Sequence, residues 1–113
     1  MADSHANLLR GTLDLLILKS LSAGARHGYG VAEWIETATD ETVLIEEGTL
    51  YPALHRIESK GWIEAEWGLS ENNRQAKFYN LTTSGKKRLR AETAMWQQYA
   101  EAVGKALATS KAR

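Results

Sequence analysis

The stretch GTLYPALHRIESKGWIEAEW, residues 48–67, decides the fold of this chain. Its apolar residues Leu50, Leu54 and Ile57 recur at helical spacing, and Gly61 follows them as a helix stop. We therefore predict a short helix that buries the face carrying these three side chains. The opposite face is left to solvent or to a ligand.

The start and the outer face of this helix point to a binding role. Thr49 is a suitable N-cap, which places Pro52 in the first turn, where a missing N–H is tolerated. Hydroxyl, imidazole and guanidinium groups opposite the apolar face can contact phosphates or base edges. The candidate DNA-contacting residues are Thr49, Tyr51, Pro52, His55 and Arg56. For Tyr51, partial burial against the first helix is the alternative.

A β-hairpin is predicted directly after this helix. Strands are expected at Trp62 to Trp67 and at Ala76 to Leu81, around a loop, Gly68 to Gln75, that is rich in Gly, Ser and Asn. Arg74 at the tip and Lys77 are expected to contact the DNA backbone or minor groove, with simple solvation the alternative for Lys77. A helix beside a cationic hairpin loop is the arrangement of a winged helix-turn-helix.

Two further helices are expected before this region. The segment Leu8 to Leu21 is apolar on nearly every side, which predicts burial both in the core and against a partner chain. Gly28 to Thr37 reads as a short amphipathic helix with Val31, Trp34 and Ile35 on one side.

A long last helix is expected over residues 83–108, after the possible N-caps Thr82, Thr83 and Ser84. Apolar residues recur along it every seven positions, which is typical of a helix that packs lengthwise against another. This stripe is predicted to pair with a second copy of the chain, although folding back on its own domain is the alternative. Its members are Leu89, Trp96, Tyr99, Val103 and Leu107.

The four tryptophans divide into two groups. Trp34, Trp62 and Trp67 are expected in core or hairpin packing. Trp96 lies in the middle of the stripe, so the Trp96 rings of two subunits, with Tyr99 nearby, could form a slot for a flat aromatic effector. Plain dimer packing is the alternative for Trp96.

Composition limits the class of protein. A chain of 113 residues forms one domain, or one domain plus an extra helix. It contains no cysteine, and it has no targeting segment or apolar run long enough to span a membrane, so a cytoplasmic location is expected. The net charge is zero, but six of the seven charged side chains between Gly68 and Arg90 are basic. Local potential, rather than the total, is what phosphates experience. A solvated helix face is the alternative for the basic run Lys86 to Arg90.

The sequence contains no recognisable catalytic or metal-binding motif. His5, His27 and His55 do not form a ligand pair at helical spacing. Gly28-Tyr29-Gly30 resembles the start of a dinucleotide loop, but Glu33 stands where a third glycine is needed. We therefore expect that the protein is not an enzyme and that it binds neither a cofactor nor a metal ion.

The expected organisation has four parts. Residues 1–7 are predicted to be disordered, 8–82 to form the winged helix-turn-helix, 83–108 to form the C-terminal helix and 109–113 to be a disordered tail. The fold class is α+β, mostly α.

Several motifs in order closely resemble the PadR family of bacterial transcriptional regulators, in particular its short members with one C-terminal helix. They are LLRGTLDLLIL at residues 8–18, HGYG at 27–30, GTLYPALHRIE at 48–58, GWI at 61–63, and KFYNLT at 77–82 with Gly85. The last helix matches only in kind. One departure is the loop from Leu69 to Ala76, which is poorer in Lys and Arg than is usual for wings in this family.

The resemblance implies a homodimeric repressor that binds double-stranded DNA through the helix at residues 49–55 and the wing near Arg74 and Lys77. It also implies a dimer built by the first and last helices, to which Leu13, Leu16 and Ile17 would contribute. Family members respond to phenolic acids, drugs or other small ligands, or to none known. Two rival functions stay open: a winged-helix module for protein contacts, suggested by nine acidic residues between Glu33 and Glu66, and a sensor in which ligand binding is primary.

Overall fold

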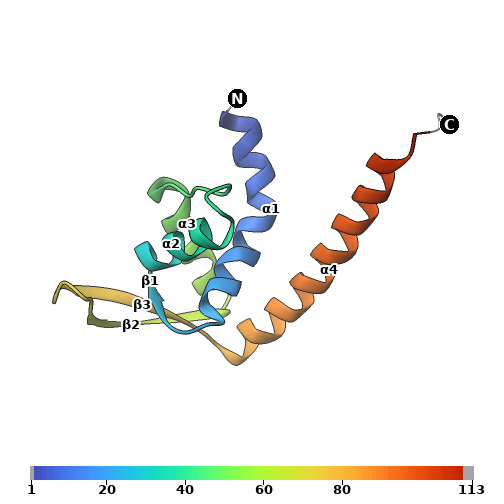
Figure 1. The fold of residues 1–113 in the computed structure, drawn as a ribbon. Coiled ribbons are helices and arrows are strands. Elements are labelled where there is room, and N and C mark those ends of the chain that lie inside the picture. Colours follow the sequence, from blue (N-terminus) through green and yellow to red (C-terminus); the bar gives the residue numbers. More distant parts are fainter. Residues whose placement is uncertain (1, 111–113) are drawn as a thin grey trace.

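The computed structural model describes residues 2–110 as four helices and a small sheet (Figure 1). The sheet is antiparallel, with strand order β1-β3-β2. Mostly helical structure with a hairpin and a long last helix confirms the predicted winged helix-turn-helix. In chain order the elements are α1 (Ala2–Leu21), β1 (Arg26–His27), α2 (Gly28–Ala38), α3 (Glu47–Ser59), β2 (Ile63–Leu69), β3 (Gln75–Leu81) and α4 (Thr83–Ala108).

The core lies where α1, α2 and α3 meet the base of the hairpin. Leu50, Leu54 and Ile57 of α3 are all at most 2% exposed, as the sequence predicts. Apolar side chains from the other elements complete the cluster: Leu13, Ile17, Leu18 and Leu21 from α1, Val31, Ala32 and Ile35 from α2, and Ile63, Tyr79 and Leu81 from the hairpin. Trp34 and Trp62 pack at its edge, in agreement with their predicted role.

The first helix begins at Ala2, whereas the sequence predicted disorder over residues 1–7 and a start at Leu8. No Gly or Pro interrupts residues 2–10, and alanine at two of these positions favours continuation of the helix toward its N-terminus. Met1 and residues 111–113, also predicted to be disordered, lie outside the described residues. At the other end, α4 ends at Ala108 as expected.

Helix α3 also begins earlier than predicted. Its N-cap is Glu46, so Thr49 is the third helical residue and Pro52 lies inside the helix. The physical reason is Ile45, which is buried in the same core cluster as Leu50. An apolar residue just before the cap that packs with the fourth helical residue fixes where a helix starts, and here that contact outweighs the capping preference of Thr49.

The hairpin is longer and its loop tighter than expected. Ser70 and Arg74 pair across the tip, where the Ser70 amide donates to the Arg74 carbonyl at 2.8 Å. Asn73 supplies the left-handed residue, with φ of 61°, that closes a turn of this length. The two-residue strand β1, which pairs Arg26 with Tyr79 and His27 with Phe78, was not predicted because so short a strand carries no periodic signal.

The last helix leaves the domain at a fixed junction and then projects away from it (Figure 1). Thr82 is the N-cap, as predicted: its hydroxyl accepts from the Gly85 amide at 3.0 Å and donates to the Gly61 carbonyl at 2.7 Å. Gly85 is buried against the carbonyl of Trp62, and a Cβ atom at Gly85 would lie 1.9 Å from that oxygen. The start of α4 is therefore locked onto the base of the wing.

We predict that Gly85→Ala destabilises the fold by about 3 kcal/mol or more, because the new methyl group meets backbone that cannot rotate away. Gly104→Ala is the matched control, since nothing lies within 4 Å of that position on α4 and alanine is the better helix former. Denaturant unfolding of both variants measures the difference. Equal midpoints for the two would contradict the packing at this junction.

Candidate nucleic-acid interface

The outer face of α3 carries the predicted DNA-contacting residues together. The burial of Leu50, Leu54 and Ile57 fixes the rotation of the helix about its axis, so the opposite side must face solvent. All five predicted residues of this helix are exposed: Thr49, Tyr51, Pro52, His55 and Arg56. Their contacts with DNA remain a prediction, but their placement on one accessible face meets its geometric requirement.

Arg56 is only partly available for an outside ligand. Its guanidinium donates to the Asp14 carboxylate of α1 at 2.5 Å, and the two side chains are half-exposed and one-quarter exposed. An exposed pair of this kind is weak, so DNA phosphate can compete for the guanidinium at modest cost. Sequence spacing does not reveal this partner, because the two residues are 42 positions apart.

Tyr51 joins α3 to the start of α2. Its ring lies so close to Gly28 that a Cβ atom there would be 2.7 Å from the Tyr51 hydroxyl, so glycine makes this contact possible. Tyr51 is still 45% exposed, and its packing is against α2, whereas the alternative reading had placed it against the first helix. Beside it, burial raises the pKa of Tyr79, with smaller contributions from Glu58 and Tyr51, so this phenol stays protonated.

The two wing cations have different surroundings. Lys77 lies 3.7 Å from the Glu58 carboxylate of α3, and its ammonium is 5.8 Å from the centre of the Tyr79 ring. Its charge is thus partly balanced within the protein. Arg74 stands exposed at the tip, and it makes no ion pair with the side chains that the structure describes, those of residues 12–110. Arg74 is therefore the wing cation that is free to meet a phosphate.

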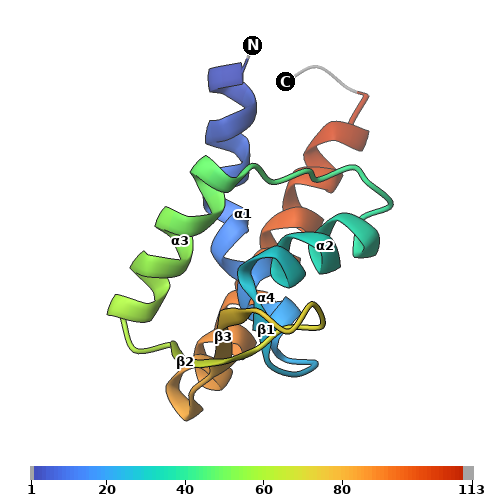
Figure 2. The ribbon, with the colours of Figure 1, turned by 90° about the vertical axis from the view of Figure 1, so that its left-hand side faces the viewer.

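A trough with a volume of about 990 Å³ runs between the wing and the start of α2, next to α3. Figure 2 looks toward this side, with the hairpin below α2 and α3. The trough is lined by three exposed side chains that were not predicted from the sequence to take part in binding: Tyr29, Trp67 and Leu69. The prediction that Trp67 is packed in the hairpin is wrong, because its ring is 67% exposed.

Because α3 starts earlier than predicted, one more charged residue lies at the N-terminal end of its exposed face. Glu47 occupies the first turn and is exposed. A carboxylate there can accept a hydrogen bond from a cytosine amino group, and it repels phosphates that approach too closely. The apolar Ile45 before the cap was the signal that could have identified this start.

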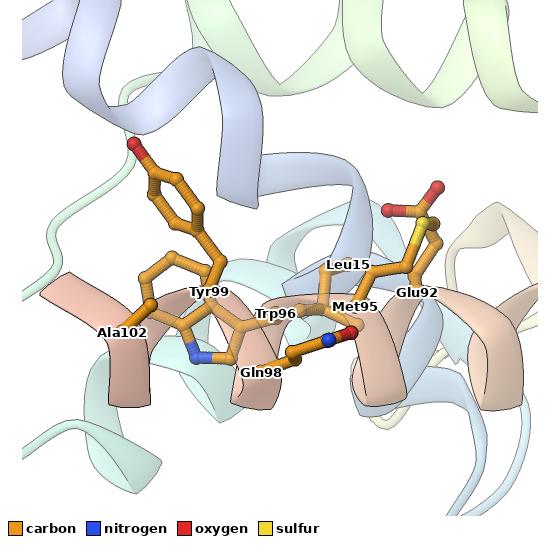
Figure 3. A pocket seen from close by; sticks show the side chains of 7 residues that line it. All are labelled: Leu15, Glu92, Met95, Trp96, Gln98, Tyr99 and Ala102. Carbon is orange, nitrogen blue, oxygen red and sulfur yellow. The ribbon is translucent and has the colours of Figure 1, made fainter.

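A second groove, of about 520 Å³, separates α1 from α4. Leu15 lines it from α1, while Trp96 and Tyr99 line it from α4, where Figure 3 shows their rings beside each other. The predicted stripe is largely uncovered: Trp96, Tyr99, Val103 and Leu107 are exposed, and Leu89 packs at the edge of the core.

The contribution of α1 to a dimer differs from the expectation. Leu13 and Ile17 are 3% and 0% exposed in the core of a single chain, so they cannot form a contact surface for a second one. Leu16 also packs against this core, although it is only partly buried. The helix turns its most apolar side inward because α2 and α3 cover it there. Among the described side chains of α1, Leu15 is the one that lines the groove.

Among the described side chains, those of residues 12–110, no group of three His, Cys, Asp or Glu residues could hold a metal ion. The helices of the described part of the chain also lack the length and apolar character needed to cross a membrane.

Comparison with known proteins gives a consistent result. Residues 17–91 match the model of the transcriptional regulator PadR-like family. A PadR family transcriptional regulator from Eggerthella lenta is 33% identical, with a TM-score of 0.77, and the match covers 96% of this chain and 93% of that one. A transcriptional regulator from Clostridium thermocellum is 31% identical, with a TM-score of 0.79 and coverage of 88% and 96%. An uncharacterized protein of Lysinibacillus sphaericus is 32% identical over 88% of this chain and 91% of its own length.

The family match covers most of the chain, and it includes the last five residues of α1, the whole of α3 and the wing. Members of this family are DNA-binding regulators and not enzymes. That the exposed face of α3 and the adjacent wing make the DNA contacts remains a prediction. The chain belongs to the PadR-like family of DNA-binding transcriptional regulators.

Proposed function

We propose that the chain acts in the cytoplasm as a homodimeric repressor that binds an operator and excludes the transcription machinery by occupying it. The observation that carries the proposal is the exposed row on α3, from Thr49 to His55, beside a wing whose tip cation, Arg74, makes no ion pair with the described side chains. In a helix-turn-helix, the residues at the start of the second helix contact base edges, while flanking groups hold the backbone.

The dimer is inferred from α4. This helix of 26 residues projects from the domain with a row of large apolar side chains in solvent, and Leu107 near its end is 81% exposed. A helix that presents such a stripe gains most of its stability when a partner covers it. A second copy of α4 carries the same stripe and supplies that cover by two-fold symmetry. The resulting pair would present two α3 helices to half-sites about 34 Å apart.

An effector is inferred from the groove between α1 and α4. Its volume of about 520 Å³ falls within the range of small-molecule sites, and Trp96 and Tyr99 offer flat aromatic faces. Stacking on these rings suits a small aromatic compound. Such a ligand would act by preferring one separation of the two α4 helices, and so one spacing of the reading helices.

A mobility-shift titration with the promoter of the protein's own gene tests the DNA role. A repressor of this kind binds the duplex, and its affinity falls steeply as salt rises, because bound phosphates release their counterions. Binding that is absent, or that does not depend on salt, would instead favour a winged-helix module for protein contacts. An unrelated duplex of equal length is the control for sequence specificity.

We predict that Arg74→Ala weakens binding to all duplexes alike and lowers the slope of log affinity against log salt by about 1. The reason is that Arg74 contacts phosphate and reads no base. Affinities over a salt series provide the measurement, and Glu71→Gln in the same loop is the control that retains the cation. An unchanged slope in Arg74→Ala would rule out a phosphate contact at the wing tip.

We predict that Trp96→Ala weakens the dimer or abolishes the quenching of tryptophan emission by aromatic compounds, because it removes the largest ring of the groove. Sedimentation or light scattering measures the first effect, and a fluorescence titration measures the second. Gln97→Ala is the control, since Gln97 is exposed on the same helix but does not line the groove. If both properties survive in Trp96→Ala, Trp96 is peripheral to dimer and ligand alike.

A further inference from the structure

The apolar face of the wing extends well beyond the core. Along β2 the alternate residues Ile63, Ala65, Trp67 and Leu69 share one face of the hairpin. Ile63 is buried and Ala65 partly buried, but Trp67 and Leu69 are 67% and 64% exposed. Packing within the described chain accounts for the first two residues of this face and leaves the last two without a covering element.

This uncovered face lies on the same side as the recognition helix. Trp67 is paired in register with Lys77, and Leu69 with Gln75. Lys77 in turn reaches Glu58 of α3, which establishes that the face is directed toward that helix. Trp67 and Leu69 line the trough, and the exposed ring of Tyr51 lines it as well. Trp67 and Leu69 therefore continue the DNA-binding face of α3 onto the wing.

The charges of the trough explain why an apolar contact matters here. Its three cations, Arg26, Arg74 and Lys77, are opposed by the carboxylates Glu33 and Glu71 in the same lining. Arg26 donates to the Ser20 carbonyl at 2.9 Å, and Lys77 is paired with Glu58, which leaves Arg74 as the cation without such an engagement in the described part of the chain. One free cation gives little counterion release, so this wing needs a second source of affinity.

We propose that Trp67, with Leu69 beside it, packs against the deoxyribose rings and the groove edge of the DNA backbone that the wing straddles. Sugar C–H surfaces and base edges are the apolar parts of a duplex that an indole can cover, while Arg74 at the tip holds the adjacent phosphate. The contact reads no base directly. Its function is to anchor the wing and so to fix the register of α3 in the neighbouring major groove.

The proposal rests on the DNA-binding function argued above, and it predicts a signature that differs from that of an ionic contact. Because apolar burial releases no counterions, Trp67→Ala lowers affinity on the order of tenfold at every salt concentration and leaves the salt slope unchanged. Arg74→Ala, in contrast, lowers the slope. Trp67→Phe keeps part of the apolar area and loses less affinity.

The experiment measures binding of the full chain to a labelled duplex from its own promoter, over a salt series, for wild type, Trp67→Ala, Trp67→Phe and Leu69→Ala. Leu44→Ala is the control for Leu69→Ala, because Leu44 is 59% exposed outside the trough. Thermal unfolding and sedimentation confirm that the variants keep their fold and association state. Both properties should be unchanged, since the substituted side chains are exposed.

Emission provides a second readout that does not depend on affinity. At saturating duplex, the DNA-induced change in tryptophan emission is expected to persist in Trp96→Phe and to vanish in Trp67→Phe.

If wild type binds the duplex but Trp67→Ala binds equally well, or if the emission change survives in Trp67→Phe, the wing contact is overturned while the DNA function stands. If wild type does not bind at all, the proposed function itself fails. A shift of the association state in Trp67→Ala would instead assign this face to a second copy of the chain and would overturn the DNA contact.

Discussion

The burial of one face of α3 is the constraint on which the rest of the structure depends. Leu50, Leu54 and Ile57 are almost fully inaccessible, and burying three such side chains is worth about 5–9 kcal/mol before the loss of conformational entropy. The surface ion pair between Arg56 and Asp14 contributes at most about 1 kcal/mol. The rotation of α3 about its axis is therefore set by the core, and the core also determines which of its side chains remain exposed.

That dependence explains which parts of the site could be predicted from the sequence. The periodicity of the apolar residues in α3 determines both the buried side and the exposed side, so a row from Thr49 to His55 follows from the pattern alone. The cap at Thr82 and the stop at Gly61, where φ is +79°, are equally local signals. The exposed row, the cap and the stop each depend only on residues that are close to them in the sequence.

The features that were missed depend on contacts between residues far apart in the chain. The start of α3 at Glu47 requires that Ile45 reach the core, and the engagement of Arg56 requires Asp14 on another helix. Exposure of Trp67 was missed for a related reason. A tryptophan in an alternating strand is usually covered, and only the three-dimensional length of the hairpin reveals that its apolar face extends past the core that would cover it.

The junction between α4 and the wing connects the two surfaces on which regulation would depend. The Trp62 carbonyl, just before β2, accepts from the Thr82 amide at 3.1 Å and lies against Gly85, while the Thr82 hydroxyl donates to the Gly61 carbonyl. These contacts leave no room for α4 to pivot at its first turn without moving the base of the hairpin. In the proposed dimer, a change in the separation of the two α4 helices would therefore reach the wings as a rigid displacement and would not be absorbed at a hinge. With the wing anchoring the register of α3 on DNA, as we propose, even a small displacement at Trp96 would change the spacing of both DNA-contacting surfaces.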